Sequence, residues 1–168
     1  MAMLGPNLNE LYKFCERQFT LKTILMIAIQ SIDRIEQLHS LGYLHRDIKP
    51  QNICIGGNSG KKANTIHLID FGLVKRFRCP NTGTHFKPGV NRGPTGTVRW
   101  LSKNAHKGNE HCRADDLISL GYMFVWMYKG HLPWDECAKP KEVYVDPKDP
   151  KVVEKTMEYE KSLRKWRK

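Results

Sequence analysis

Apolar residues recur at steps of three and four along residues 20–39, TLKTILMIAIQSIDRIEQLH, which predicts an amphipathic helix. The predicted apolar stripe consists of Leu21, Ile24, Leu25, Ala28, Ile32, Ile35 and Leu38. Thr20 is a common type of helix N-cap, and Gly42 fits a stop just beyond the helix. Residues 115–130, DDLISLGYMFVWMYKG, are apolar almost all round and predict a second, deeply buried helix that ends at Gly130.

Two short segments rich in β-branched residues, NICIG (52–56) and TIHLIDFG (65–72), are joined by a loop of Gly, Asn and Lys, which predicts a β-hairpin. Residues 77–109 are polar and rich in Gly and Pro, so we expect a long loop of a functional or disordered kind. Residues 150–168 predict a last helix, with a stripe of Val152, Thr156, Tyr159, Leu163 and Trp166. The predicted fold class is mainly α with a small β-hairpin region.

The composition fits one ordinary globular domain, with 168 residues, 40% hydrophobic and 27% charged. Neither a membrane-spanning run nor a secretory signal is visible, so we expect no membrane partner. Five scattered cysteines indicate thiols in a reducing compartment, and we expect an intracellular protein of the cytoplasm, the nucleus or both.

The net charge of +11 is compatible with nucleic acid, an anionic membrane, or acidic and phosphorylated protein as a partner, and equally with a solvated basic surface. The last eight residues, KSLRKWRK, hold five of the 28 Lys and Arg residues, so the C-terminal end explains part of the excess. Nucleic acid is not the expected partner, because no nucleic-acid-binding motif accompanies the charge.

Residues 45–52, HRDIKPQN, place four ionisable side chains and an amide between an apolar helix and an apolar strand: His45, Arg46, Asp47, Lys49 and Asn52. This placement is typical of a loop built for chemistry. A DFG sequence begins eighteen residues after the amide, and a GTVRW turn and a D-x-x-S-x-G helix follow. Together, these spacings resemble the catalytic half of a protein kinase.

The resemblance assigns Asp47 to accept and orient the substrate hydroxyl, and Lys49 to offset negative charge on the transferred phosphoryl group. Asn52 and Asp70 are hard oxygen ligands, and the resemblance makes them the holders of Mg²⁺ on the phosphates of ATP. The supporting residues that it implies are His45 in the loop motif, Thr97 contacting the two catalytic side chains, and Asp116 capping the backbone of the loop.

Several stretches narrow the resemblance to the casein kinase I group, including its tau-tubulin kinase branch: LGPNL, HLIDFGLVK, TGTVRW, NAHKGNEHCRADDLISLGY and LPW. LSKN (101–104) also stands where most kinases have A-P-E. The group and the loop residue Lys49 both imply a Ser/Thr protein kinase. We expect one partial kinase domain over residues 1–168, family-like to about residue 135, with a divergent basic helical tail over 136–168.

Within that group, an anion pocket beside the activation loop favours acidic or pre-phosphorylated protein substrates. By position, Arg46, Arg92 and Arg99 would form it, since guanidinium groups bind phosphate in a bidentate manner. The alternative is an Arg-rich solvated loop, because Arg92 stands where Lys is usual.

For ATP, the resemblance places Met3 and Leu4 at the hinge that meets the adenine. Ile53 and Ile69 would form the floor of the same cleft, or would simply be core.

The sequence contains neither a G-x-G-x-x-G loop nor a V-A-x-K strand, which in kinases belong to the N-terminal lobe. We therefore expect a fragment of the large lobe that is weakly active or inactive alone. Two other hypotheses remain open at this stage. One is a non-catalytic, kinase-derived module that binds phosphorylated or acidic partners, and the other is a basic nucleic-acid-binding protein with accidental motifs.

Overall fold

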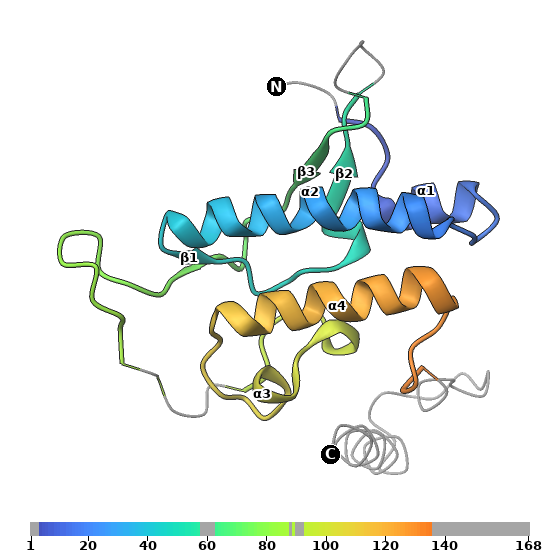
Figure 1. Ribbon diagram of the computed structural model, residues 1–168. Coiled ribbons are helices and arrows are strands. Elements are labelled where there is room, and N and C mark those ends of the chain that lie inside the picture. The colour runs from blue at the N-terminus through green and yellow to red at the C-terminus, as the bar shows by residue number, and fades with distance from the viewer. Residues whose placement is uncertain (1–3, 58–62, 88, 90–92, 136–168) are drawn as a thin grey trace, which may run out of the picture. The chain divides into compact units, whose positions relative to one another are not determined.

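The computed structural model describes residues 4–57, 63–87, 89 and 93–135 (Figure 1). The chain divides into two compact units, Met1–Gly130 and His131–Lys168. In the first unit the helices, short 3₁₀ helices (η) and strands are, in chain order, α1 (Leu8–Phe14), α2 (Leu21–Ser40), β1 (Tyr43–Leu44), η1 (Pro50–Asn52), β2 (Ile53–Ile55), β3 (Ile66–Leu68), β4 (Lys75–Arg76), η3 (Val98–Trp100), α3 (Lys103–His106) and α4 (Arg113–Lys129). In the second unit the description covers residues 131–135, a turn in which Leu132 N donates to Asp135 Oδ2 at 2.8 Å.

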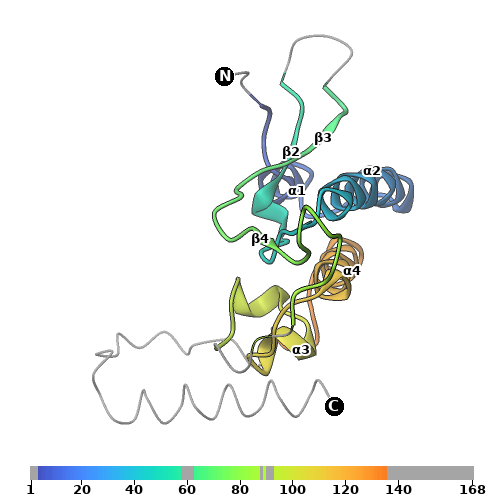
Figure 2. The ribbon, with the colours of Figure 1, turned by 90° about the vertical axis from the view of Figure 1, so that its left-hand side faces the viewer.

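The two long helices α2 and α4 lie side by side and form the centre of the first unit (Figures 1 and 2). Both predicted helices are confirmed. Thr20 Oγ1 accepts from Thr23 N at 3.1 Å, and Gly42 follows the end of α2 with a φ of +85°. Gly130 ends α4 in the left-handed conformation with a φ of +80°. The largest fully buried apolar side chains of this unit are Leu8, Ile35, Leu44, Ile48, Ile53, Leu120, Met123 and Met127.

The predicted stripe of α2 is partly wrong. The buried residues of this helix are Ile24, Ile27, Ser31 and Ile35. Leu21, Leu25 and Ile32 are 58%, 54% and 45% exposed. Apolar residues occupy more than one row of this helix, so a three-and-four spacing alone could not identify the row that packs. The prediction that α4 is buried all round is also wrong. This helix buries one face, while four of its large apolar residues are exposed, namely Leu117, Ile118, Val125 and Tyr128.

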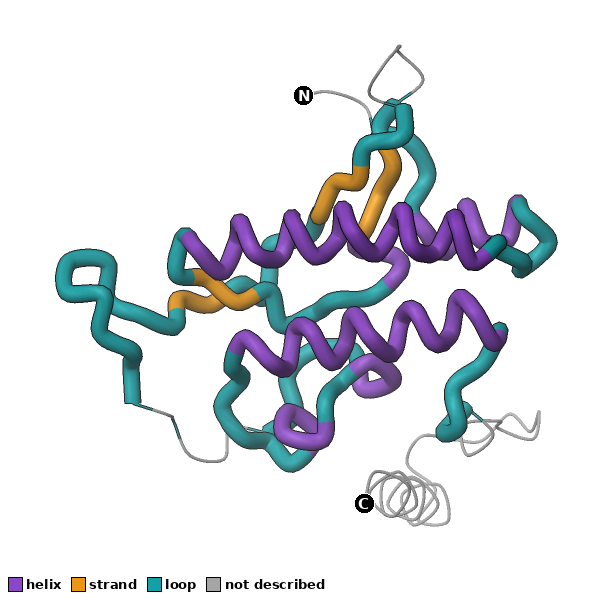
Figure 3. Tube along the Cα trace, viewed as in Figure 1, coloured by secondary structure: helices purple, strands orange, loops and turns teal. Residues whose placement is uncertain are grey.

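The predicted hairpin is confirmed: β2 pairs antiparallel with β3, with Ile53 opposite Leu68. Figure 3 shows this pair beside a second two-stranded sheet of β1 and β4, which pairs Tyr43 with Arg76. The sequence reasoning did not predict α1. Its start is fixed by Asn7, whose Oδ1 accepts from the N–H groups of Asn9 and Glu10.

Residues 77–109 were expected to be a loop, and the described part is more ordered than that. An isolated antiparallel bridge joins Arg78 to His85, and η3 and α3 follow. Ser102 caps α3, because its hydroxyl accepts from Ala105 N at 3.0 Å. The predicted helix over residues 150–168 lies outside the described residues.

The fold is mainly helical with a small hairpin, as predicted from the sequence, and the second sheet, of β1 and β4, was not predicted. The assignment to a large lobe stays a prediction. Among the described residues, we find no helix with the length and apolar character that a membrane crossing requires.

Candidate functional site

Asp47 lies at the centre of a hydrogen-bonded cluster and is 8% exposed. Its Oδ1 accepts from the N–H and the hydroxyl of Thr97 at 2.9 and 2.7 Å. Its Oδ2 accepts from Lys49 Nζ at 2.7 Å, and Lys49 Nζ also donates to Thr97 Oγ1 at 3.0 Å. Burial acts to raise the pKa of Asp47, but the bonds from Lys49 and Thr97 outweigh it and hold the pKa below its usual value. The cluster therefore keeps an ionised carboxylate beside a positive charge.

The close approach of Thr97 to Asp47 depends on Gly96, which has a φ of +102°. A Cβ at this position would lie 2.4 Å from the carbonyl oxygen of Arg46. Only glycine combines this backbone conformation with this contact.

Asp116 of α4 is 2% exposed, and its carboxylate accepts hydrogen bonds from the backbone of the loop. Its Oδ2 accepts from His45 N at 2.9 Å, and its Oδ1 accepts from Arg46 N at 2.8 Å. Arg46 has a φ of +68°, which is unfavourable for a residue with a long side chain. The two bonds to Asp116 stabilise this strained turn, the capping role that the kinase resemblance implied. His39 of α2 joins the same carboxylate, with its Nε2 2.8 Å from Oδ2.

His45 is fully buried and spans the loop. Its Nδ1 accepts from Asp47 N at 3.3 Å, and its Nε2 lies 3.1 Å from the carbonyl oxygen of Ile69. These partners require a neutral ring with the proton on Nε2. Burial lowers the pKa of His45, in agreement with that state. The ring centroid lies 5.7 Å from that of Phe71, so His45 links the loop to the DFG sequence.

The two predicted Mg²⁺ ligands are brought together by the hairpin. Asn52 precedes β2 and Asp70 follows β3, and Ile69 N donates to Asn52 O at 2.9 Å across the pair. Asn52 Nδ2 donates to Asp47 O at 2.9 Å and to Asp47 Oδ2 at 3.1 Å, so its amide oxygen is the atom that a cation could bind.

Asp70 is exposed, has a φ of +61°, and accepts from Gly72 N through Oδ1 at 3.2 Å. An amide oxygen and an exposed carboxylate fit a hard cation that takes its remaining ligands from water or phosphate. Among the described residues, no cluster of three His, Cys, Asp or Glu side chains could hold a metal without such added ligands.

Of the residues predicted for ATP, Leu4, Ile53 and Ile69 lie in or beside the hairpin. Leu4 is 37% exposed, and the chain after it runs along β2, with Gly5 N donating to Ile55 O at 2.9 Å. Ile53 is buried in the core, and Ile69 is half-buried. Met3 lies outside the described residues.

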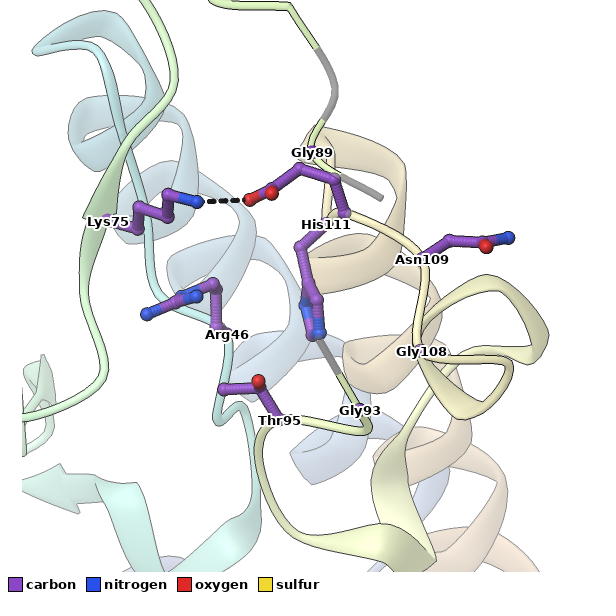
Figure 4. A pocket seen from close by; sticks show the side chains of 9 residues that line it. Arg46, Lys75, Gly89, Gly93, Thr95, Gly108, Asn109 and His111 are labelled. Atoms are coloured by element: carbon purple, nitrogen blue, oxygen red, sulfur yellow. Dashed lines mark hydrogen bonds and ion pairs between the residues drawn. The ribbon is translucent and has the colours of Figure 1, made fainter. Parts of the chain in front are cut away.

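Beside the loop lies a pocket of about 220 Å³ that contains one of the three predicted anion-binding arginines, Arg46 (Figure 4). Lys75 of β4 lines it as well and forms an ion pair with Glu110 Oε1 at 2.6 Å. Among the described residues, the lining consists of Arg46, Lys75, Gly89, Gly93, Thr95, Gly108, Asn109, Glu110 and His111.

Arg99, the second of the predicted arginines, is not among these residues. Arg99 stacks its guanidinium 4.9 Å from the ring centroid of Trp100 and 5.7 Å from that of Trp126. Arg92 lies outside the described residues. The anion-binding role of all three stays a prediction.

Sequence reasoning missed several residues of the site. Lys75 could have been predicted, because it is the last residue of the stretch HLIDFGLVK, three residues after Gly72. No sequence pattern indicated His39 or His111 as site residues. The partner of His39, Asp116, lies far away in sequence, and His111 has no hydrogen-bond partner among the described residues. Asp115 was also missed: it accepts from Ser102 Oγ and Cys112 N and ties α3 to the start of α4.

One comparison with known families bears on this site. The family model described as "Protein kinase domain" matches residues 2–168. The match includes the loop, the hairpin and α4, which carry the geometry above.

Proposed function

Because the chain belongs to the protein kinase family, we propose that it is a Ser/Thr kinase of the casein kinase I type that transfers the γ-phosphate of ATP to protein hydroxyls. The observation that carries this proposal is the cluster of Asp47, Lys49 and Thr97. A kinase must orient a hydroxyl beside a carboxylate and neutralise the charge on the phosphoryl group, and this cluster supplies both groups within hydrogen-bond distance.

In this mechanism Asp47 accepts a hydrogen bond from the substrate hydroxyl and takes up its proton. Its lowered pKa keeps the carboxylate ionised at neutral pH, so that it is ready to accept. Lys49 then faces the transferred phosphoryl group, and Thr97 fixes the orientation of both side chains. Asn52 and Asp70 would hold Mg²⁺, which when bound offsets the negative charge of the ATP phosphates.

Two sequence features support Ser/Thr specificity and the casein kinase I type, namely the loop residue Lys49 and the LSKN segment in place of A-P-E. The pocket lined by Arg46 and Lys75 supports a preference for acidic or pre-phosphorylated substrates. Guanidinium and ammonium groups are the usual partners of phosphate oxygens.

We expect the transfer by these 168 residues alone to be slow. Their sequence carries no Gly-rich loop and no V-A-x-K lysine to hold the ATP phosphates, and catalysis of phosphoryl transfer depends on positioning. The rate should fall far below the roughly 1–100 s⁻¹ of kinases in general.

A second function is supported by the same pocket. The chain would then act as a non-catalytic module that binds phosphorylated or acidic protein partners through Arg46 and Lys75. This alternative requires phosphopeptide binding without Mg-ATP binding.

The test is transfer of labelled phosphate from ATP to casein and to matched peptides with Ser, Thr or Tyr acceptors. We expect slow transfer to Ser and Thr, lost in Asp47→Asn and kept in Asp33→Asn, an exposed aspartate of α2 as control. Transfer that survives Asp47→Asn would contradict the mechanism, and a preference for Tyr would contradict the specificity. Phosphopeptide binding with neither transfer nor Mg-ATP binding would favour the module.

A further inference from the structure

His111 lies two residues before α4 begins at Arg113. Its two ring nitrogens are buried and have no hydrogen-bond partner in the described part of the chain. One of the two must carry a proton in the neutral ring, so a donor and an acceptor are both unpaired. Buried polar atoms of folded proteins are nearly always paired, and those that are not require an explanation. A ligand from outside the chain would supply one.

The position of His111 shows which ligand that could be. The residue lines the 220 Å³ pocket together with Arg46 and Lys75, and Figure 4 shows its side chain between Arg46 and the backbone at Gly93 and Gly108. It also lines an adjoining hollow of about 470 Å³ that contains Lys75 as well. The pocket also contains the Glu110 carboxylate, which is ion-paired with Lys75. Two cationic side chains and an unpaired imidazole still outnumber this one carboxylate as donors for an oxyanion, and the volume exceeds that of several water molecules.

We propose that His111 is a third oxyanion contact of this pocket, and that it takes up a proton from solvent when the oxyanion binds. The ligand class is a phosphate monoester on the substrate, or an inorganic dianion of the same shape. The inference rests on the anion pocket of the proposed function and adds a pH dependence to it.

The charges around the imidazole support the coupling. Burial lowers the pKa of His111 most, Asp115 raises it, Arg46 lowers it, and Asp116 and Glu110 raise it, with a net lowering. Lys75 also faces the pocket. Before an anion binds, the imidazole is therefore neutral at pH 7. A dianion brings negative charge to the ring and favours the imidazolium, so by linkage the anion binds more tightly as the pH falls.

The experiment uses sulfate as the probe, because its charge stays constant between pH 6.0 and 7.5 whereas a phosphate monoester titrates in that range. Sulfate affinity of the 168-residue chain is measured by calorimetry at both pH values and constant ionic strength. We expect the affinity to be about five- to tenfold higher at pH 6.0, since one unit of pKa change corresponds to a factor of ten. His111→Gln keeps a hydrogen-bonding side chain but cannot titrate, so its affinity should not change with pH.

Two further measurements make the result specific. His85→Gln removes a histidine of the adjoining hollow and should keep the pH dependence. In the unmodified chain, the NMR titration of the His111 Cε1–H signal should shift to higher pH in saturating sulfate. This readout does not depend on the folding of a variant.

An unchanged pH dependence in His111→Gln, or an NMR titration that sulfate does not move, would overturn the role of His111 and leave the anion pocket standing. Absence of sulfate binding at both pH values would overturn the pocket and with it this inference. Phosphoryl transfer to unprimed peptides, measured separately, tests the kinase function itself.

Discussion

The catalytic loop and the neighbouring pocket differ in how their polar groups are satisfied. In the loop, Asp47 and His45 each have several partners within the chain, and so does Asp116 of α4, which binds the loop backbone. In the pocket, both nitrogens of His111 lack one among the described residues. Polar groups that are already paired hold their geometry without a ligand, which is the preorganisation that catalysis needs. Unpaired groups gain their partners from the ligand, which suits a binding site whose occupancy varies.

The largest effect should come from Asp116→Ala, which leaves the N–H groups of His45 and Arg46 without their acceptor in a buried place. Removing one partner of a buried charged network costs about 3–5 kcal/mol. We expect the free energy of unfolding, measured with urea, to fall by about that amount. Asp33→Ala, at an exposed position, should change it by less than about 0.5 kcal/mol. A small loss in Asp116→Ala would mean that the loop does not depend on this anchor.

Gly96→Ala should cause the second-largest loss of stability, because it combines a positive φ with a Cβ placed 2.4 Å from Arg46 O. Strain of this kind costs about 1–3 kcal/mol. Gly83→Ala is the matched control, since Gly83 has a φ of +68° and no atom within 4 Å of an added Cβ. Urea unfolding should show the larger loss at position 96. Equal losses at both positions would show that the contact with the loop carbonyl contributes nothing.

A smaller effect is expected for Lys75→Met in the pocket, measured as sulfate affinity. Loss of the ammonium group should weaken binding about tenfold, or about 1.4 kcal/mol, and the Glu110 carboxylate should add repulsion because Lys75 no longer offsets its charge. The double variant Lys75→Met, Glu110→Gln separates the two contributions and should recover part of the affinity. Lys103→Met, on an exposed position of α3, serves as the control and should bind as the unmodified chain does.

The smallest effect is the change of stability with pH that His45 and His111 cause. Burial lowers the pKa of both rings in the folded state, so the unfolded chain binds more protons between the two pKa values. Stability is therefore full above the unfolded value of about 6.5 and falls as the pH drops below it. We expect a loss of about 1 kcal/mol in urea unfolding between pH 7.5 and 5.5. His111→Gln should reduce this loss, because it removes one of the two rings, and an unchanged loss in this variant would contradict the assignment.

The catalytic loop could be predicted closely from the sequence, and the pocket could not. Asp47, Lys49 and Asn52 lie within six residues, and the hairpin register that carries Asp70 to them follows from two adjacent apolar strands. The pocket joins Lys75 to Glu110 across 35 residues of polar, Gly-rich chain. No periodic pattern predicts which residues of such a segment meet.

Helix packing shows a similar limit. The existence and ends of α2 could be predicted from spacing and capping residues, but its buried face could not. Ser31 lies in the buried row and several leucines lie outside it. Which row packs is decided by the elements that α2 contacts, α4, β3 and β1, about which the local pattern of α2 contains no information.

The anchoring of the loop by Asp116 has a consequence for how the protein is made. All the side chains assigned to chemistry between Asp47 and Asp70 leave the ribosome before α4 is synthesised, yet the loop backbone acquires its acceptor only with Asp116, about seventy residues later. During synthesis at about 5–20 residues per second, the nascent loop therefore spends several seconds without the contact that fixes it. Ordering of the loop is then coupled to the docking of α4 on α2, so a nascent chain acquires its helical core and its catalytic geometry in the same event.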